Sequence, residues 1–547
     1  MIDISIVIPC YNGEQFIKEC LDSCLNQTFD ASRYEIIVVN DSSTDNSLSL
    51  LKEYSNKYEN VRVLTKEHSG EADTTNLGIY ESNGKYIAIM HIDDVMYNDR
   101  LEYQYNILEQ NNNIDILGCG FHYYDDLTKG FCPREISKIT IEDMLKYNHV
   151  AHPTVMFRRS SINTLPFLYE QYYFPSADYK FWFTCLFHNL TIYNYPKRVI
   201  KYRRHDNQAS KTQLNKVKIQ NNRIYNIYNH TTDNPEITVI IPFRNENVEV
   251  ERTVQSILAT SNKTKILLID DFSNDAFDYN ALAYLYNIDY IRLEKRKGVA
   301  QCRNIGVDLS TTKYCLLLDA HMRFYEDNWD ISLIEKLENN PNSIICSNTV
   351  VIHKSENNIY SNEDGIKRIT TYGASINLDY TKERCFRHAW NYKKINAQNN
   401  LIKIPSVLGA AYAFNKKWWN KIHGLNGLIT FGLDEALMSI KSWMFGGNCY
   451  LKNDWFVGHI YRQKQPYSVN EYDVAWNEFY QILLFVSEKE QNLYLNNLWK
   501  RIFPTTKEKI INNYDFYEKD NIEKEKHYID NNKQISFEYF RDSINVI

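Results

Sequence analysis

Two short clusters of acidic and histidine residues each directly follow an apolar segment. The first is His91-Ile92-Asp93-Asp94, after residues 86–90, and the second is Asp319-Ala320-His321, after residues 314–318. A carboxylate with a second polar ligand two residues away can hold a divalent cation against a diphosphate. An isolated motif of this kind often only satisfies a turn or a helix start. Because it recurs in the same context, it argues for a metal site in each half of the chain.

The two clusters belong to a longer repeat, in which the same sequence elements return about 230 residues later. Ser5–Asn12 returns as Thr238–Asn245, and Val38–Asp45 returns as Leu268–Asp275. Order and spacing are kept while most of the sequence differs, which indicates duplication of a whole domain.

Each repeat alternates predicted strands with predicted helices. In the first, a strand over Ile4–Pro9 leads into a helix over Glu14–Leu25 and a second strand over Glu35–Asn40. This order predicts an α/β fold with a mostly parallel sheet and helices on both faces. Ligands bind such sheets at the carboxyl ends of the strands. Carboxylates stand at these strand ends in both repeats: Asp41, Asp93, Asp271 and Asp319.

The chain of 547 residues is too long for one core, and we expect three parts. They are a first domain over residues 1–230, a second over 231–470 and a mainly helical extension over 471–547. The linker is placed in the polar, Asn-rich stretch 207–234, and Val474–Val486 shows helical periodicity. The sequence assigns no chemistry to the extension.

Composition excludes several classes of protein. A net charge of −6 gives no electrostatic reason to expect nucleic acid as a partner. The eleven cysteines contain no CxxC pair, which favours buried thiols in a reducing compartment over disulfides or a zinc site. There is no visible signal peptide and no apolar run near the ~20 residues of a membrane span. We therefore expect a cytoplasmic protein, with membrane association at most peripheral, at the inner membrane face.

Seven segments of the first half together carry a family resemblance: Ile6–Asn12, Val39–Asp45, Gly70–Gly78, His91–Asp94, His152–Arg159, Ala177–Trp182 and Tyr202–His205. Through them the first half resembles GT-A glycosyltransferases of family 2 over nearly the whole domain. The resemblance implies a GT-A fold, which is Rossmann-like, and a nucleotide-sugar donor, usually a UDP-sugar. Asp41 is similar to the residue that holds the uracil or ribose, and four further residues complete the implied donor site: Pro9, Tyr11, Asn12 and Gly70.

The same resemblance implies the chemistry of the first half. Asp93 is similar to the metal ligand, with His91 beside it, and His205 is placed like the late residue that closes over the diphosphate and its metal. Asp178 matches the general base that takes a proton from the acceptor hydroxyl in inverting transfer. Three positions depart from the family pattern, which has aspartate, an acidic residue and arginine there: His91, Ala177 and Thr75.

The second half resembles family 2 at its start, and the polypeptide N-acetylgalactosaminyltransferase and galactosyltransferase group at its end. The carrying segments are 298–306, 319–321, 431–435, 443–447 and 457–462. The resemblance implies that one Mn²⁺, or Mg²⁺, is held by Asp319, His321 and His459. Glu435 matches the catalytic base of inverting relatives, with Asp434 contacting the acceptor. The implied donor residues are Pro242, Arg244, Asp271, Gly298 and Arg303.

The leading hypothesis is a metal-dependent glycosyltransferase with two active sites. It would use nucleotide-sugar donors, with UDP-sugars the expected class, and a glycan or glycolipid acceptor, and would build a capsular or other surface polysaccharide. Two alternatives stay open: one active domain beside a non-catalytic donor- or acceptor-binding domain, or a protein or peptide acceptor. The stereochemical outcome in the second half is also open, because retaining relatives share its acidic segment. A non-enzymatic scaffold gives no reason for carboxylates to recur at strand ends.

Overall fold

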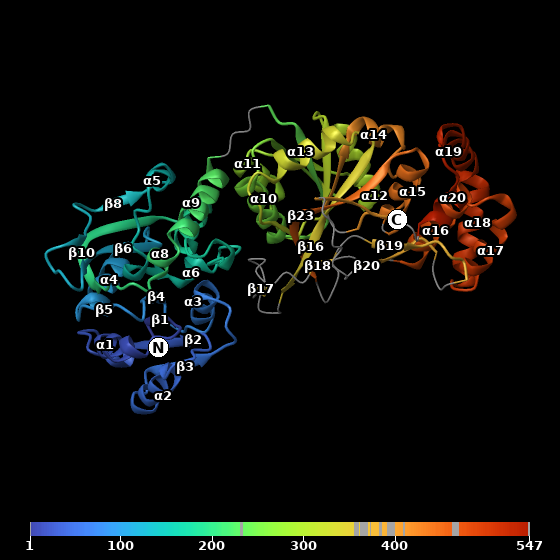
Figure 1. Ribbon diagram of the computed structural model, residues 1–547. Coiled ribbons are helices and arrows are strands. Elements are labelled where there is room, and N and C mark those ends of the chain that lie inside the picture. Colours follow the sequence, from blue (N-terminus) through green and yellow to red (C-terminus); the bar gives the residue numbers. More distant parts are fainter. Residues whose placement is uncertain are drawn as a thin grey trace. The chain divides into compact units, whose positions relative to one another are not determined.

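The computed structural model forms two compact units, Met1–Asn229 and His230–Ile547 (Figure 1). It describes residues 2–229, 234–354, 360–361, 370–371, 374–381, 385–390, 400–408, 411–430, 432–461 and 470–544. Two residues of the sequence motifs, Phe431 and Arg462, lie outside these ranges. Each unit is described here by itself.

The first unit is built on one twisted, mixed sheet. Its strand order is β3 (Val61–Thr65), β2 (Tyr34–Asn40), β1 (Ile4–Cys10), β4 (Tyr86–Ile89), β9 (Met156–Arg158), β6 (Ile116–Tyr123), β10 (Ile192–Tyr202) and β5 (Val95–Met96). The first four strands run parallel, and β9 is antiparallel to both of its neighbours. Two short strands, β7 (Gly130–Phe131) and β8 (Ser137–Ile139), pair with β6 and β10.

The second unit repeats this sheet strand for strand. The order is β13 (Asp289–Arg292), β12 (Thr264–Asp270), β11 (Ile237–Phe243), β14 (Tyr314–Leu318), β22 (Ala411–Asn415), β16 (Ser343–Lys354), β23 (Asn448–Tyr461) and β15 (Met322–Phe324). Here too the fifth strand, β22, is antiparallel to its neighbours. The predicted α/β fold with two tandem GT-A-type domains is confirmed. The prediction of a mostly parallel sheet is wrong: four parallel strands lie on the side of Asp41 and Asp271, but both sheets are mixed, because β9 and β22 run antiparallel to their neighbours.

Helices cover the sheets between these strands. In the first unit they are α1 (Glu14–Leu25), α2 (Ser47–Lys57), α3 (Glu71–Tyr80), α4 (Arg100–Gln110), α5 (Ile141–Lys146), α6 (Arg159–Ile162), α7 (Ala177–Phe187), α8 (Ala209–Thr212) and α9 (Leu214–Tyr228). In the second unit they are α10 (Val248–Thr260), α11 (Tyr279–Leu285), α12 (Val299–Leu309), α13 (Trp329–Asn339), α14 (Lys416–Lys421) and α15 (Asp434–Met444). In the stretch predicted as linker, α9 buries Ile224 and Ile227, so most of that stretch packs as part of the first unit.

The C-terminal extension is helical and belongs to the second unit. Its helices are α16 (Glu471–Phe485), α17 (Glu488–Trp499), α18 (Pro504–Asn513), α19 (Lys519–Asn532) and α20 (Phe537–Ser543). One hydrophobic core runs without a break from Ile240 in β11 to Phe540 in α20. Within the described residues, no helix is long and apolar enough to cross a bilayer. All eleven cysteines are free thiols, and only Cys132 is not buried.

Candidate active sites

The second unit contains a cavity of about 350 Å³ at the carboxyl ends of β11, β12 and β14. Every site residue predicted for this half lines it: Pro242, Arg244, Asp271, Gly298, Arg303, Asp319, His321, Asp434, Glu435 and His459. These residues span more than 200 positions of sequence. The fold therefore brings the implied donor, metal and acceptor groups into one cavity.

Asp271 fixes the loop that leads into α12. Its two carboxylate oxygens accept from the backbone N–H groups of Lys297 at 2.5 Å and Gly298 at 2.9 Å. Gly298 has φ +86°, and a Cβ there would lie 2.1 Å from Cα of Thr430. Only glycine fits this backbone shape and this close approach. The Arg244 guanidinium adds a bond to the Asp271 carbonyl at 2.9 Å.

Three side chains in the cavity form a compact ligand set: Asp319, His321 and His459, whose ligand atoms all lie within 4.8 Å of one another. Asp319 and His321 follow β14, and His459 on β23 is paired across the sheet with Met322. Burial alone would raise the pKa of Asp319, but its contacts with His459 and Arg303 hold that pKa well below its usual range. Two imidazoles and an ionised carboxylate are suitable ligands for Mn²⁺, so the residues fit the implied metal.

Arg303 connects this ligand set to the acidic helix start. Its buried guanidinium pairs with Asp434 and, at 3.0 Å, with Oδ1 of Asp319. The adjacent Glu435 is part-buried, and the hydroxyl of Tyr412 donates to it at 3.4 Å. Arg303 was predicted as a donor-binding residue, and the structure places it between two carboxylates. Of the two acidic residues, Asp434 forms the ion pair with Arg303, whose charge also acts on Glu435 from nearby.

The backbone just before α15 positions Asp434 and Glu435, and the contacts that hold it were not predicted from the sequence. It is held by α16 of the extension, where the side chain of Asn477 makes three hydrogen bonds of 2.9 Å to the backbone of Ile429 and Gly432. Gln481 adds a bond to the carbonyl of Leu433 at 3.0 Å. The extension, to which no chemistry was assigned, therefore sets the start of α15.

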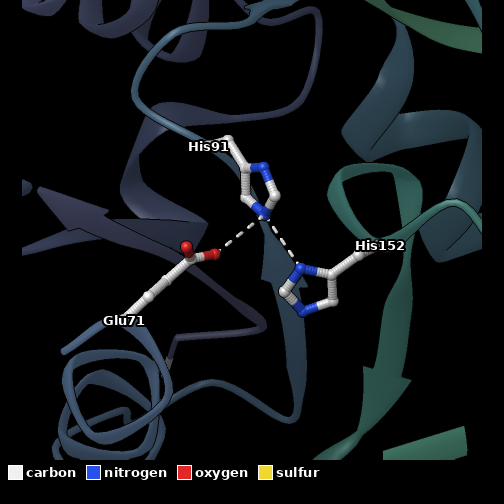
Figure 2. A group of neighbouring side chains, drawn as sticks. All are labelled: Glu71, His91 and His152. Atoms are coloured by element: carbon white, nitrogen blue, oxygen red, sulfur yellow. Dashed lines mark hydrogen bonds and ion pairs between the residues drawn. The ribbon is translucent and has the colours of Figure 1, made fainter. Parts of the chain in front are cut away.

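In the first unit the predicted metal residues form two neighbouring contacts. Oδ2 of Asp93 lies 3.0 Å from Nε2 of His205. His91 instead directs its Nε2 at Nδ1 of His152, 2.8 Å away, and Oε1 of Glu71 lies 3.8 Å from the same nitrogen (Figure 2). Glu71 and His152 were not predicted as site residues. They were not recognised because they are distant from His91 in the sequence, although His152 stands in a segment that carried the family resemblance.

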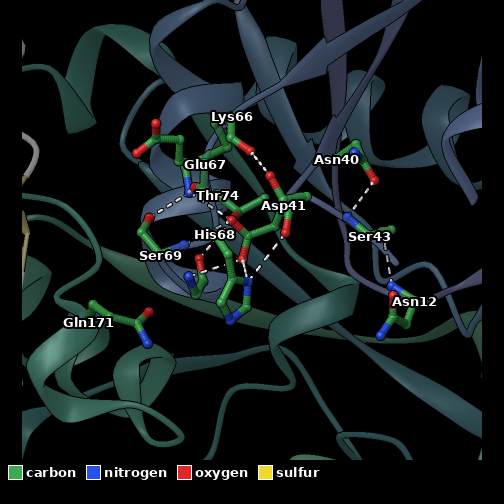
Figure 3. Close-up of polar contacts among 12 residues, drawn as sticks. Asn12, Asn40, Asp41, Ser43, Lys66, Glu67, His68, Ser69, Thr74 and Gln171 are labelled. Atoms are coloured by element: carbon green, nitrogen blue, oxygen red, sulfur yellow. Dashed lines mark hydrogen bonds and ion pairs between the residues drawn. The ribbon is translucent and has the colours of Figure 1, made fainter. Parts of the chain in front are cut away.

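Asp41 holds the loop before α3 as Asp271 holds its counterpart (Figure 3). Its oxygens accept from the backbone N–H groups of Ser69 and Gly70, each at 3.0 Å, and from Nζ of Lys66 at 2.7 Å. Gly70 has φ +100°, and a Cβ there would lie 2.3 Å from Nε2 of Gln171. The two units thus build the same aspartate-to-glycine contact from different surrounding residues.

The turn after the first strand is also shared. Oδ1 of Asn12 accepts from the backbone N–H of Thr44 at 2.8 Å, and Oδ1 of Asn245 accepts from that of Asn274 at 2.8 Å. Pro9 lies inside β1. Next to the turn, the ring of Tyr11 is 48% exposed and packs on His68, with ring centroids 4.5 Å apart. An exposed aromatic ring beside the Asp41 network offers a surface on which a nucleobase can stack.

Asp178 lies in the first turn of α7, where it is part-buried. Nδ2 of Asn148 donates to its Oδ2 at 3.2 Å. Burial raises the pKa of this carboxyl to about 6, and the nearby charge of Glu71 adds to the rise. A carboxylate with this pKa is a stronger proton acceptor than an ordinary aspartate and is still ionised at neutral pH.

A comparison with known protein families decides the assignment of the chain. Glycosyl transferase family 2 matches residues 5–165 and again 238–418, together more than half of the sequence. The chain belongs to glycosyl transferase family 2. The predicted family is thereby confirmed, and the two matches fall in the two units that share one strand order.

Relatives of known sequence are named as glycosyltransferases, and solved structures are similar to part of the chain. An uncharacterised glycosyltransferase of Rickettsia felis is 29% identical over 398 residues, 62% of this chain and 64% of the relative. The chain thus spans somewhat less than two thirds of that protein. The poly(ribitol-phosphate) beta-glucosyltransferase of Bacillus spizizenii is 44% identical over 117 residues, 21% of this chain and 18% of the relative. Among solved structures, GalNAc-T7 with UDP, GalNAc and Mn²⁺ has a TM-score of 0.44 at 20% identity, over 58% of this chain and 57% of that one.

Proposed function

We propose that the chain is a metal-dependent glycosyltransferase with two active sites, one in each unit. Each site takes a sugar from a nucleotide-sugar donor, a UDP-sugar, and passes it to a growing surface glycan. The observation that carries the proposal is the repeated constellation: in both units a strand-end aspartate fixes a glycine loop, and an ionisable carboxylate stands at the start of a later helix. The donor needs the loop that the aspartate fixes, and the acceptor hydroxyl needs the carboxylate at the helix start.

The donor is held by the loops around Asp41 and Asp271. The aspartate oxygens fix the loops in shape, Tyr11 offers its ring to a base in the first unit, and Arg244 stands at the corresponding place in the second. Asp319, His321 and His459 would hold the cation in the second unit, and Asp93 with His205 in the first. Bound there, a divalent cation supplies the positive charge that stabilises the departing nucleoside diphosphate.

Asp178 and Glu435 are proposed as the general bases. Each accepts the proton of an acceptor hydroxyl as that oxygen forms a bond to the anomeric carbon and the bond from that carbon to the diphosphate breaks. The raised pKa of Asp178 suits this role in the first unit. In the second unit Asp434 is neutralised by Arg303, which leaves Glu435 to accept the proton and Asp434 to position its surroundings.

The acceptor is proposed to be a surface polymer rich in hydroxyl groups. The support is the local similarity to a poly(ribitol-phosphate) beta-glucosyltransferase, whose acceptor is such a polymer by name. A capsular or related surface polysaccharide is the corresponding product class. Because both units belong to one family, we favour alternating or sequential addition of two sugars.

Single substitutions of the two bases test the two-site proposal. A panel of UDP-sugars with Mn²⁺ is incubated with the wild type, Asp178→Asn and Glu435→Gln, and release of UDP is measured. We expect each variant to lose turnover of one set of donors and keep the other. If either variant leaves every turnover unchanged, the unit that carries it is not an active site.

A second candidate function is one active unit beside a donor-binding unit. The observation that favours it is in the first unit, where His91 replaces the family's aspartate and lies 2.8 Å from His152. In this case Asp41→Ala would remove one equivalent of bound UDP without any loss of turnover. Under the two-site proposal the same variant loses both the equivalent of bound UDP and the turnover of the first site.

A further inference from the structure

A group of three side chains in the first unit is not used by the proposed transfer. Glu71 begins α3, His91 follows β4, and His152 begins a short 3-10 turn, so three separate segments supply them. Figure 2 shows all three directed at one point. Their ligand atoms lie within 4.8 Å of one another.

We propose that Glu71, His91 and His152 form a binding site for a transition-metal ion such as Zn²⁺. Two imidazoles and one glutamate are a ligand set found at zinc sites that keep an open fourth position. The site shares no residue with the pair of Asp93 and His205, although His91 also lies within 4.8 Å of Asp93, and it uses two residues outside the strand-end motif.

The spacing of the ligand atoms suits such an ion. Ligands about 2.0–2.1 Å from a tetrahedral metal are roughly 3.3 Å from one another. Nε2 of His91 lies 2.8 Å from Nδ1 of His152 and 3.8 Å from Oε1 of Glu71. These two distances bracket the required value, so shifts of about half an ångström would bring both pairs to it, and the third pair, Glu71 and His152, lies within 4.8 Å.

His152 is oriented for this role by a neighbour. Its Nε2 lies 2.9 Å from the hydroxyl oxygen of Tyr169, which leaves Nδ1 directed at His91. Both His152 and Tyr169 are buried, with 7% and 4% of their surface exposed, so the ring cannot turn freely. Histidine ligands in metal sites are held in this way through the second ring nitrogen.

The strand-end carboxylates have contacts outside this group, although Oδ2 of Asp94 is buried without a hydrogen-bond partner. Asp93 contacts His205, and the backbone N–H of Arg203 donates to Oδ1 of the buried Asp94 at 2.9 Å. An ion bound by His91, Asp93 and Asp94 is nevertheless the competing arrangement, because those ligand atoms also lie within 4.8 Å. The two arrangements share only His91, so variants of the other residues separate them.

The test is metal binding by the full chain, which does not require sugar transfer. The protein is stripped with a chelator, Zn²⁺ is added, and bound zinc is measured after equilibrium dialysis. We expect His152→Gln to bind one equivalent less than the wild type. His122→Gln is the matched control, since His122 of the same unit also bonds a tyrosine hydroxyl, that of Tyr97 at 2.7 Å, and it should bind as the wild type does.

Two further variants keep the proposal open to refutation if His152→Gln misfolds. Glu71 has 42% of its side chain exposed, so Glu71→Gln should fold and weaken the site by at least about tenfold. Tyr169→Phe should weaken it by about 10–100-fold. Unchanged zinc binding in Glu71→Gln and Tyr169→Phe overturns the proposal, as does equal zinc content in His152→Gln and His122→Gln. Loss of the equivalent in Asp93→Asn but not in His152→Gln also overturns it, in favour of the competing arrangement.

Because the readout is bound metal, it is independent of the two-site transferase proposal. A chain that binds the zinc equivalent but releases no UDP would keep this inference and reject the proposed function. A chain that transfers sugar but binds no such equivalent would do the reverse.

Discussion

Replacement of Asn477 by alanine should slow the second active site without touching it directly. Asn477 is fully buried in α16 and makes its three bonds to the backbone of Ile429 and Gly432. The substitution leaves one N–H and two carbonyl groups of the loop without their partner. The loop ends at Leu433, so its displacement moves Asp434 and Glu435.

The size of the effect follows from these bonds. Each buried backbone group that loses its partner costs about 1–3 kcal/mol, so three give on the order of 3 kcal/mol even at the low end. If the loop relaxes so that these groups bond to water, the cost in stability is smaller but Glu435 is displaced. A shift of about 1 Å at a catalytic group costs about 100-fold in rate.

The assay combines UDP release with thermal unfolding, in an Asp178→Asn background that silences the first site. We expect Asn477→Ala to lower the turnover number by about 100-fold. Asn497→Ala is the matched control: Asn497 lies in the same extension and donates to the carbonyl of Tyr380 at 2.7 Å, away from the loop. Equal turnover in the two variants would refute the idea that α16 positions the base.

Three other predictions concern the two sites. In a Glu435→Gln background, turnover should fall about tenfold per pH unit below pH 6, because burial raises the pKa of Asp178 to about 6 and only its carboxylate accepts a proton. Asn148→Ala removes a hydrogen bond to this carboxylate and should therefore move the acidic limb of the pH–rate profile to higher pH. A profile that does not move would contradict the role of Asp178 as the base. Asp319→Ala should abolish Mn²⁺ stimulation of the second site and leave the first site unaffected, as measured by UDP release across a Mn²⁺ titration. Gly298→Ala should destabilise the chain by about 1–3 kcal/mol and weaken UDP binding. Gly432 has a similar φ of +99°, but an added Cβ would meet no atom closer than 3.9 Å, so Gly432→Ala should have a smaller effect. Calorimetry compares the two variants, and an equal loss of stability would show that the clash with Thr430 is not the cause.

The carboxylates at the strand ends, which both units share, were predictable from the sequence, because such residues follow their strands directly. Asp41 and Asp271 come one residue after β2 and β12, so locating the strand locates the carboxylate. The direction of β9 and β22 was not predictable, since a short apolar run has the same pattern whether it runs parallel or antiparallel to its neighbour.

Contacts between distant segments were also beyond the sequence. His152 meets His91 across 61 positions, and Asn477 meets Ile429 across 48. Neither pair has a local signature, because a buried histidine or asparagine has many structural uses. The pairing of Arg303 with Asp434, across 131 positions, was missed for the same reason, and Arg303 was predicted only as a donor-binding residue.

The unbroken core of the second unit has a practical consequence for dividing the chain. Trp476 and Phe479 of α16, like Phe537 and Phe540 of α20, are buried in the same core as the strands of the sheet. A fragment that stopped near residue 470 would expose these apolar surfaces to solvent and would aggregate rather than fold. An expression fragment of the second unit should therefore start after Asn229 and run through α20, whereas a fragment of the first unit can end at Asn229.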